Sequence, residues 1–277
     1  MGTAPAIARP ARRPVTVARD RRRPRWWVEL SVLAGGYGAY AAIRNTRAST
    51  ATDPHALSRA MANARGVVAV ERFFDLHVEG GIQRWFLSMP DMVRGANVFY
   101  ATAHVLVTAT VVVALWFAQP DHYRRMRTAL LLSTAIALAV FAVLPTAPPR
   151  LLPAGVGAQD TLATLGGLWS FRTPIIEHIS DPLAAMPSLH LAWAVWCSAA
   201  VAPLVHSRFW RRAALAYPAV VGLVVVITGN HWILDVVAGV LVGLAGLVLA
   251  GLRQAMGSGR GSANTNVSRL VARVRAT

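Results

Sequence analysis

Lysine is absent from the sequence, cysteine occurs once, and charged residues of either sign are few. Charged side chains make up 14% of the 277 residues, whereas an ordinary soluble domain carries about 25%. Because Cys197 has no second cysteine to pair with, neither an internal disulfide nor a thiolate metal site can form. Its apolar neighbours favour a small core residue at that position. With 55% apolar residues, this composition predicts an integral membrane protein.

Acidic residues are also scarce, and the net charge of +16 comes from 28 basic residues that are all arginine. So basic a chain first suggests nucleic-acid binding. The arginines cluster beside apolar segments, however, where the positive-inside rule and anionic lipid headgroups account for them. We therefore expect anionic lipid headgroups, and no nucleic acid, as the partners of these clusters.

Six long apolar stretches predict six membrane-spanning helices, each close to the roughly 20 residues that a bilayer requires. They cover residues 26–43, 98–117, 128–144, 188–204, 212–228 and 231–250. The predicted fold is all-α, a polytopic six-transmembrane-helix bundle. Residues 1–25 would form a disordered Arg/Pro-rich cytoplasmic tail, 26–251 the membrane domain, and 252–277 a basic cytoplasmic tail. In the last span, Gly239, Gly243 and Gly246 suit close helix contact.

Arginine in the short loops sets the expected orientation of the bundle. The segments 122–127 and 206–212 are basic, as are both tails, so we place all of these on the cytoplasmic side of the cell membrane. The segments 44–97 and 145–187 and the turn at 229–230 then face outward. The 44–97 segment also contains arginines, but long loops are translocated largely regardless of charge.

Apolar residues recur at helical spacing over residues 57–78, with charged residues between them. The pattern predicts an amphipathic helix lying on the outer membrane interface. A helix that packs on the bundle without touching lipid fits the pattern equally well. A second short helix of this kind is expected over residues 82–87.

His231 and Asp235 lie at the mouth of the last apolar stretch. An ionisable residue at membrane depth costs about 2.5 kcal/mol or more, so it indicates a functional site. Helix positions four apart share a face, so Asp235 can orient the His231 ring and make its other nitrogen a better nucleophile. We expect Asn230 to cap this helix and leave a positive end suited to an anion. A His–Asp pair that only satisfies itself between helices is the alternative.

A second histidine, His190, is expected at the same outward end. Ser188 can cap the helix that begins there, and amides of its first turn can hold an anion. A nucleophilic histidine needs a second group to protonate the departing oxygen, and another histidine is matched to neutral pH. Alone, His190 would be an ordinary interfacial histidine, but beside the His231–Asp235 pair it favours catalysis.

Two arginines of the 145–187 segment are candidates for holding phosphate. Arg150 follows two prolines that stiffen its segment, and its planar guanidinium fits phosphate oxygens. Arg172 is a second, weaker candidate, and an ordinary interfacial arginine is the alternative for Arg150. Two histidines and an aspartate could ligate a metal, but without a carboxylate cluster we expect no metal and no cofactor.

The order of these motifs resembles the type 2 phosphatidic acid phosphatase superfamily. The order is Arg150, then Pro-Ser-Leu-His at 187–190, then a histidine and an aspartate at 231 and 235, all within residues 97–250. Four details are similar to the inositol phosphorylceramide synthase-type inositol phosphotransferase branch. They are Leu rather than Gly at 189, Pro-Thr-Ala-Pro-Pro-Arg at 145–150, Thr-Gly-Asn-His at 228–231, and Asn97 with Tyr100 and His104 where the second span starts.

The resemblance implies a role for each site residue. His231 would attack phosphorus and become a phosphohistidine, and Asp235 would orient it. His190 would protonate the leaving alcohol and then activate the acceptor. Arg150 and Ser188 would hold phosphate oxygens.

Two phosphate-binding positions of the superfamily are changed in this sequence. Val143 stands where a lysine is usual, and Val225 where an arginine is usual. Hydrogen bonds from other side chains would have to compensate, and the candidates are Arg172, His104, Asn97 and Thr228.

The expected function is cleavage or transfer of the phosphoryl-bearing group of a membrane lipid phosphate. Water as the acceptor makes a phosphatase, while a bound alcohol such as inositol or a sugar makes a transferase, which the branch resemblance favours. The alternatives are a simple phosphatase of the phosphatidic acid or polyprenyl phosphate type, a non-catalytic lipid carrier on the same fold, and a cation-coupled transporter. A single deep carboxylate, Asp235, argues against the transporter.

Overall fold

The computed structural model describes residues 25–51, 54–153, 155–166 and 183–274. Within these ranges the chain forms helices joined by short connections, which confirms the all-α prediction, and an isolated bridge pairs Thr146 with Ala184. The helices are α1 (Trp26–Ala51), α2 (Pro54–Phe73), α3 (Glu79–Leu87), α4 (Pro90–Ala118), α5 (Pro120–Val143), η1 (Pro149–Leu151), α6 (Thr161–Leu165), α8 (Leu189–Val201), η2 (Ala202–Leu204), α9 (Arg208–Ile227) and α10 (Ile233–Val274).

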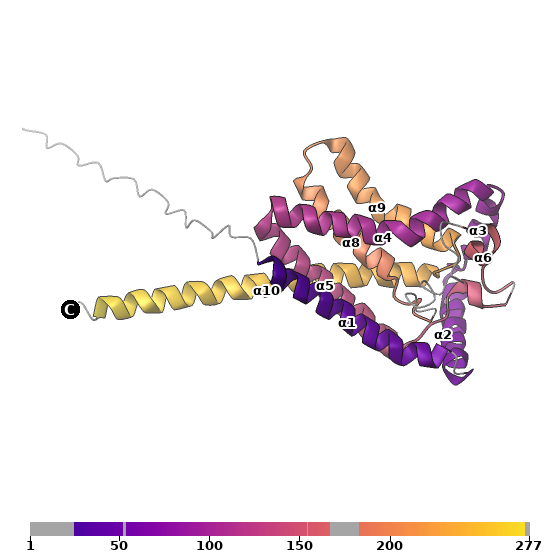
Figure 1. Cartoon of the computed structure of the whole chain (residues 1–277), viewed down its shortest axis with the longest axis horizontal. Coiled ribbons are helices and arrows are strands. Elements are labelled where there is room, and N and C mark those ends of the chain that lie inside the picture. Colours follow the sequence, from indigo (N-terminus) through magenta and orange to yellow (C-terminus); the bar gives the residue numbers. More distant parts are fainter. Residues whose placement is uncertain (1–24, 52–53, 154, 167–182, 275–277) are drawn as a thin grey trace, which may run out of the picture.

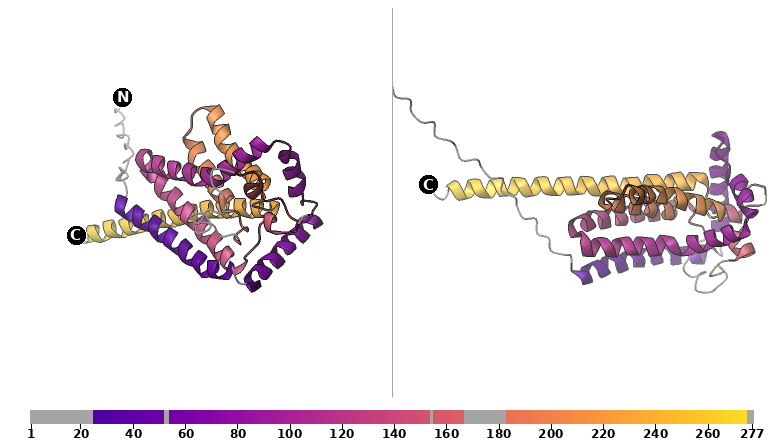
Figure 2. Two further views of the ribbon diagram at one scale, coloured as in Figure 1. Left: turned by 45° about the vertical axis from the view of Figure 1, so that its right-hand side comes forward. Right: turned by 90° about the horizontal axis from the view of Figure 1, so that it is seen from above.

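The long helices run side by side, and α2, α3 and α6 gather at one end of the bundle (Figure 1). Helix α10 packs mainly on α5 and α8, while α9 packs on α8. At the end away from α2, α10 continues past the other helices (Figure 2). Because α10 begins beside α2 and α3, its first turn and the residues before it belong to the end where these short helices gather.

Four helices in the described part are long and apolar enough to cross a membrane. They are α4, α5, α9 and the segment Ile233–Met256 of α10. The apolar helix Leu189–Leu204 is shorter, and α1 is not among the four. A polytopic membrane protein is thus supported, while the count of six spans stays a prediction.

The basic segments 122–127 and 206–212 are predicted to be loops, but most of their residues lie within helices. The helices begin earlier than the apolar stretches do. Helix α4 starts at Pro90 rather than 98, and α5 at Pro120 rather than 128, so that Gln119 alone separates them. Proline is favoured at the first helical position because its fixed φ suits the helix and its missing N–H costs nothing there. The basic segment 122–127 therefore lies within α5, and much of 206–212 lies within α9.

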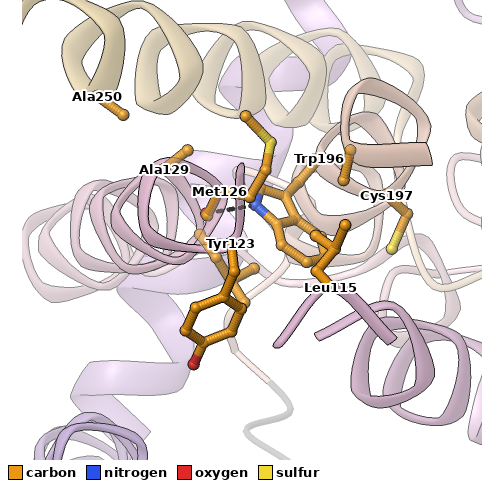
Figure 3. Close-up of a cluster of buried hydrophobic side chains, with 9 residues drawn as sticks. Leu115, Tyr123, Met126, Ala129, Trp196, Cys197 and Ala250 are labelled. Atoms are coloured by element: carbon orange, nitrogen blue, oxygen red, sulfur yellow. Dashed lines mark hydrogen bonds between the residues drawn. The ribbon is translucent and has the colours of Figure 1, made fainter. Parts of the chain in front are cut away.

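A buried cluster joins α4, α5, α8 and α10 (Figure 3). Trp196 is its centre, and its indole Nε1 donates a 2.6 Å hydrogen bond to the backbone oxygen of Met126. A buried tryptophan N–H needs such a partner. Cys197 lies buried in the same cluster, as expected of a small core residue.

The glycines of α10 allow close contact with the neighbouring helices, as the sequence predicts. A Cβ added to Gly239 would lie 2.4 Å from the backbone oxygen of Ser188, and one added to Gly246 would lie 2.0 Å from Ser133 Oγ. Both distances are shorter than any van der Waals contact. The Gly239 contact brings α10 directly against the start of α8, where His190 lies.

Helix α2 packs one face on the bundle, which is the alternative that the 57–78 pattern left open. Its buried apolar residues, Ala60, Ala64, Val67 and Val68, form a cluster with Ala147 and Trp232. The Ala147 N–H also donates to the backbone oxygen of Ala60 at 3.1 Å. Helix α2 thus supports both the segment before Arg150 and the segment after His231, and contact of its other face with lipid stays a prediction.

Candidate active site

His231 lies in the tight connection between α9 and α10. Gly229 makes the turn with φ of +70°, a conformation that side chains disfavour, and a Cβ there would lie 2.7 Å from the Gln159 oxygen. The backbone N–H groups of Asn230 and His231 both donate to the oxygen of Val225, at 3.1 and 3.2 Å. The connection is therefore fixed from both sides, and His231 is buried in it at 5% exposure.

Asn230 does not cap α10, contrary to the sequence prediction. The helix begins at Ile233, and Asp235, in its first turn, accepts a 2.9 Å hydrogen bond from the Trp232 N–H. A carboxylate at the third helical position that reaches back to the capping residue is half of a capping box. Asn230 instead accepts from Arg150 and donates to Thr228 Oγ1 at 2.8 Å.

The His231 ring is oriented by a backbone carbonyl and by Asp235. Its Nδ1 lies 2.9 Å from the oxygen of Ala185 and 3.4 Å from Asp235 Oδ2. Because a carbonyl can only accept, Nδ1 carries a hydrogen, and in the neutral ring Nε2 then holds the lone pair. The expected His–Asp contact is present, but His231 precedes the helix, and the contact with the Ala185 oxygen is shorter.

His190 faces His231 from the first turn of α8. Ser188 caps this helix, as predicted, and accepts from the Leu191 N–H at 3.5 Å. The ring centroids of His190 and His231 lie 5.8 Å apart in an edge-to-face arrangement. The two rings therefore lie close together at the same end of the bundle.

Helix α4 holds the other side of the His190 ring. Tyr100 stacks on it with centroids 4.4 Å apart, and the His104 ring lies at 4.1 Å. His190 Nε2 is buried and has no hydrogen-bond partner among the described residues. The motif at 97–104 thus places His104 beside the acid–base candidate.

Arg150 lies next to the His231 connection. Its backbone N–H donates to the Gly229 oxygen at 3.1 Å, and its Nη1 donates to Asn230 Oδ1. Its Nε is 3.9 Å from Asp160 Oδ2, and 12% of its side chain is exposed. The structure therefore brings Arg150 to the site with a carboxylate as a competing partner. Arg172 lies outside the described residues.

Asn97 and Thr228, two of the compensating candidates, already have protein partners. The Asn97 amide donates to the Gly166 oxygen at 2.8 Å, and its oxygen accepts from Thr161 at the same distance. Thr228 Oγ1 donates to the Val224 oxygen at 2.9 Å. These bonds hold α6 and the turn in place, and a contact of either residue with phosphate stays a prediction.

Two glutamates that the sequence reasoning missed occupy the first amides of α10. The Ile233 N–H donates to Glu79 Oε1 and the Leu234 N–H to Glu71 Oε1, both at 2.8 Å. The positive end of α10, expected to be open to an anion, is thus filled by carboxylates of α2 and α3. The scarcity of acidic residues is the one sequence signal that could have drawn attention to them.

The same glutamates meet at His77. His77 Nδ1 lies 3.4 Å from Glu71 Oε2 and 3.3 Å from Glu79 Oε2. Burial, and then a hydrogen bond with Glu79, raises the pKa of Glu71 to about 9. A carboxyl group with so high a pKa is mostly protonated at neutral pH.

Fold and site together define a helical membrane protein with a pair of neighbouring histidines, one ring fixed by a carbonyl and a carboxylate, beside an arginine. The chain belongs to the PAP2 superfamily, whose family model matches residues 65–249. This confirms the superfamily resemblance, and it makes the chain an enzyme, a phosphatase or phosphotransferase, that acts on lipid phosphate esters.

The other comparisons add less. No curated protein matches the chain. Among solved structures, the crystal structure of Aquifex aeolicus LpxE is similar, with a TM-score of 0.42 and 18% sequence identity, and the match covers 59% of this chain and 93% of that one.

Proposed function

We propose that the enzyme cleaves a lipid phosphate ester at the outer leaflet through a phosphohistidine on His231. The observation that carries the proposal is the His231 ring, whose Nδ1 is fixed by the Ala185 oxygen at 2.9 Å while the ring faces His190. An unprotonated Nε2 held opposite a second imidazole is the arrangement that nucleophile and general acid require.

In the first step His231 Nε2 forms a bond to phosphorus while the bond from phosphorus to the lipid oxygen breaks. His190 gives its proton to that departing oxygen. Asp235 Oδ2, 3.4 Å from Nδ1, stabilises the positive ring that results. Arg150 and Ser188 hold the phosphate oxygens during the transfer.

In the second step His190, now neutral, takes a proton from the acceptor. The acceptor oxygen bonds to phosphorus, and the bond to Nε2 breaks. Water as the acceptor completes hydrolysis, and an alcohol completes transfer. The sequence details at 97–104, 145–150 and 228–231 favour an alcohol, with inositol as the first candidate.

The test is to incubate purified protein with lipid phosphates labelled at phosphorus. We expect an acid-labile, base-stable phosphoenzyme in the wild type and none in His231→Ala. In His190→Ala we expect slower formation, and adding inositol should divert label from phosphate to an inositol ester. A wild type that never becomes labelled, with phosphatidic acid or polyprenyl phosphate, would contradict the mechanism. Lipid transfer that is unchanged in His231→Ala would favour the carrier.

A further inference from the structure

We propose that Glu71 and Glu79 are positioning residues for the nucleophile, which hold the first turn of α10 so that His231 faces His190. The proposal rests on the proposed function, since it concerns the same histidine. Neither glutamate contacts the reacting atoms. Each acts through the backbone that follows His231.

The contacts form an unbroken series along that backbone. Three consecutive N–H groups, of Trp232, Ile233 and Leu234, donate to Asp235, Glu79 and Glu71 at 2.9, 2.8 and 2.8 Å. The first amides of a helix have no intrahelical partner, so these carboxylates fix where α10 begins. His231 immediately precedes this series, and a shift of the first turn would move its ring directly.

Trp232 joins the series to the rest of the site. Its side chain is fully buried, and its Nε1 donates to the Ala147 oxygen at 3.0 Å, in the segment that leads to Arg150. His77, which contacts both glutamates, stacks on the Trp232 ring at 6.0 Å. The glutamates, the tryptophan and the arginine segment therefore form one support around the nucleophile.

Buried acidic side chains gather at the start of α10, unlike the rest of the described chain. Its buried carboxylates are Glu29, Glu71, Glu79 and Asp235, and three of them surround the start of α10. Glu29 accepts from Arg127 and from the Tyr123 hydroxyl, so it has a cation as its partner. Glu71 and Glu79 instead lie against backbone amides, the partly buried His77 and each other. Burying two acidic groups without an arginine partner among the described residues is costly, and holding the nucleophile is the role that we assign to them.

The test compares alanine and glutamine at both positions. Glutamine keeps an oxygen for the α10 amide, whereas alanine removes it. We expect Glu79→Ala and Glu71→Ala to lower kcat for a short-chain, water-soluble phosphate ester by at least about tenfold, with KM within about twofold. Glutamine at either position should restore kcat to within about threefold, and the rate of phosphoenzyme formation should follow kcat.

Glu29→Ala is the matched control, since it removes a buried carboxylate far from the histidines. It should lower the unfolding midpoint without changing kcat per folded molecule. If Glu79→Ala and Glu71→Ala behave like Glu29→Ala, the two glutamates only stabilise the fold, and the proposal is wrong. A stoichiometric divalent ion in the purified protein, lost in His77→Ala, would also overturn it, because a metal would then hold the two glutamates. A wild type without a phosphoenzyme would instead contradict the proposed function.

Discussion

At the scale of single residues, the site depends on which partner each polar atom already has. His231 Nδ1 is hydrogen-bonded to the Ala185 oxygen, which leaves Nε2 available for chemistry. The side chains of Asn97 and Thr228 donate hydrogen bonds to backbone oxygens of the protein. Arg150 shares its guanidinium between Asn230 and Asp160, so a phosphate that binds there competes with Asp160.

This competition gives a prediction for Arg150. Hydrogen bonds to charged groups contribute about 1.5–3 kcal/mol, so Arg150→Ala should raise KM for a lipid phosphate roughly 10- to 100-fold. The KM of Arg150→Lys should lie between those of the wild type and Arg150→Ala, because lysine keeps the charge but lacks the planar fork. Asp160→Asn should lower KM, since it removes the competing charge. Steady-state kinetics check all three, and a fall in kcat alone in Arg150→Ala would mean that Arg150 acts on the chemical step.

At the scale of elements, α10 organises the site through its glycine-containing face and its first turn. Its glycine face, formed by Gly239, Gly243 and Gly246, lets the helix lie against α8 and α5. Its first turn is held by Glu71 of α2 and Glu79 of α3. In lipid there is little hydrophobic drive between helices, so close packing at small residues supplies much of their attraction. The position of His231 relative to His190 thus depends on how closely α10 meets α8.

The glycine face predicts a sharp difference between two substitutions to alanine. Gly246→Ala places a Cβ on Ser133 and on the backbone oxygen of Ala129, so overpacking should cost about 1–3 kcal/mol of stability. Gly38→Ala, in α1, meets nothing within 4 Å and should be neutral or slightly stabilising. Thermal unfolding in detergent checks both. Equal midpoints for the two variants would mean that α10 does not pack on α5 as described.

The sequence could predict the histidines and Asp235 because motif spacing and helix ends are local signals. The sequence misplaces the start of α10, because Trp232 lacks the side-chain oxygen of a usual capping residue and only the Asp235 half of a capping box is present. Glu71 and Glu79 could not be assigned, because their partners lie 163 and 154 residues away and a capping carboxylate has no periodic pattern. The Ala185 oxygen carries no side-chain signal at all.

At the scale of the whole molecule, the histidine site and the arginine-rich ends of α5 and α9 lie at opposite ends of the bundle (Figure 1). The positive-inside rule then predicts that the site faces outward. A substrate phosphate would be drawn from the outer leaflet, while the basic ends would contact anionic lipid on the cytoplasmic side.

Single cysteines test this orientation, since the chain has one cysteine and that one is buried. In a Cys197→Ala background, Arg84→Cys lies on exposed α3 and Arg211→Cys on the exposed first turn of α9. A membrane-impermeant maleimide should label Arg84→Cys in intact cells and Arg211→Cys only after permeabilisation. The opposite pattern would place the site on the cytoplasmic side.

The carboxylates under α10 also bear on how the protein is made. Glu71 and Glu79 are synthesised more than 150 residues before the amides that they hold. During synthesis the first four-fifths of the chain can be inserted without a nucleophile, an oriented ring or a filled helix end. Under the proposed mechanism the site is complete only once α10 has been made, so a partly made chain would have no nucleophile with which to attack the lipids around it.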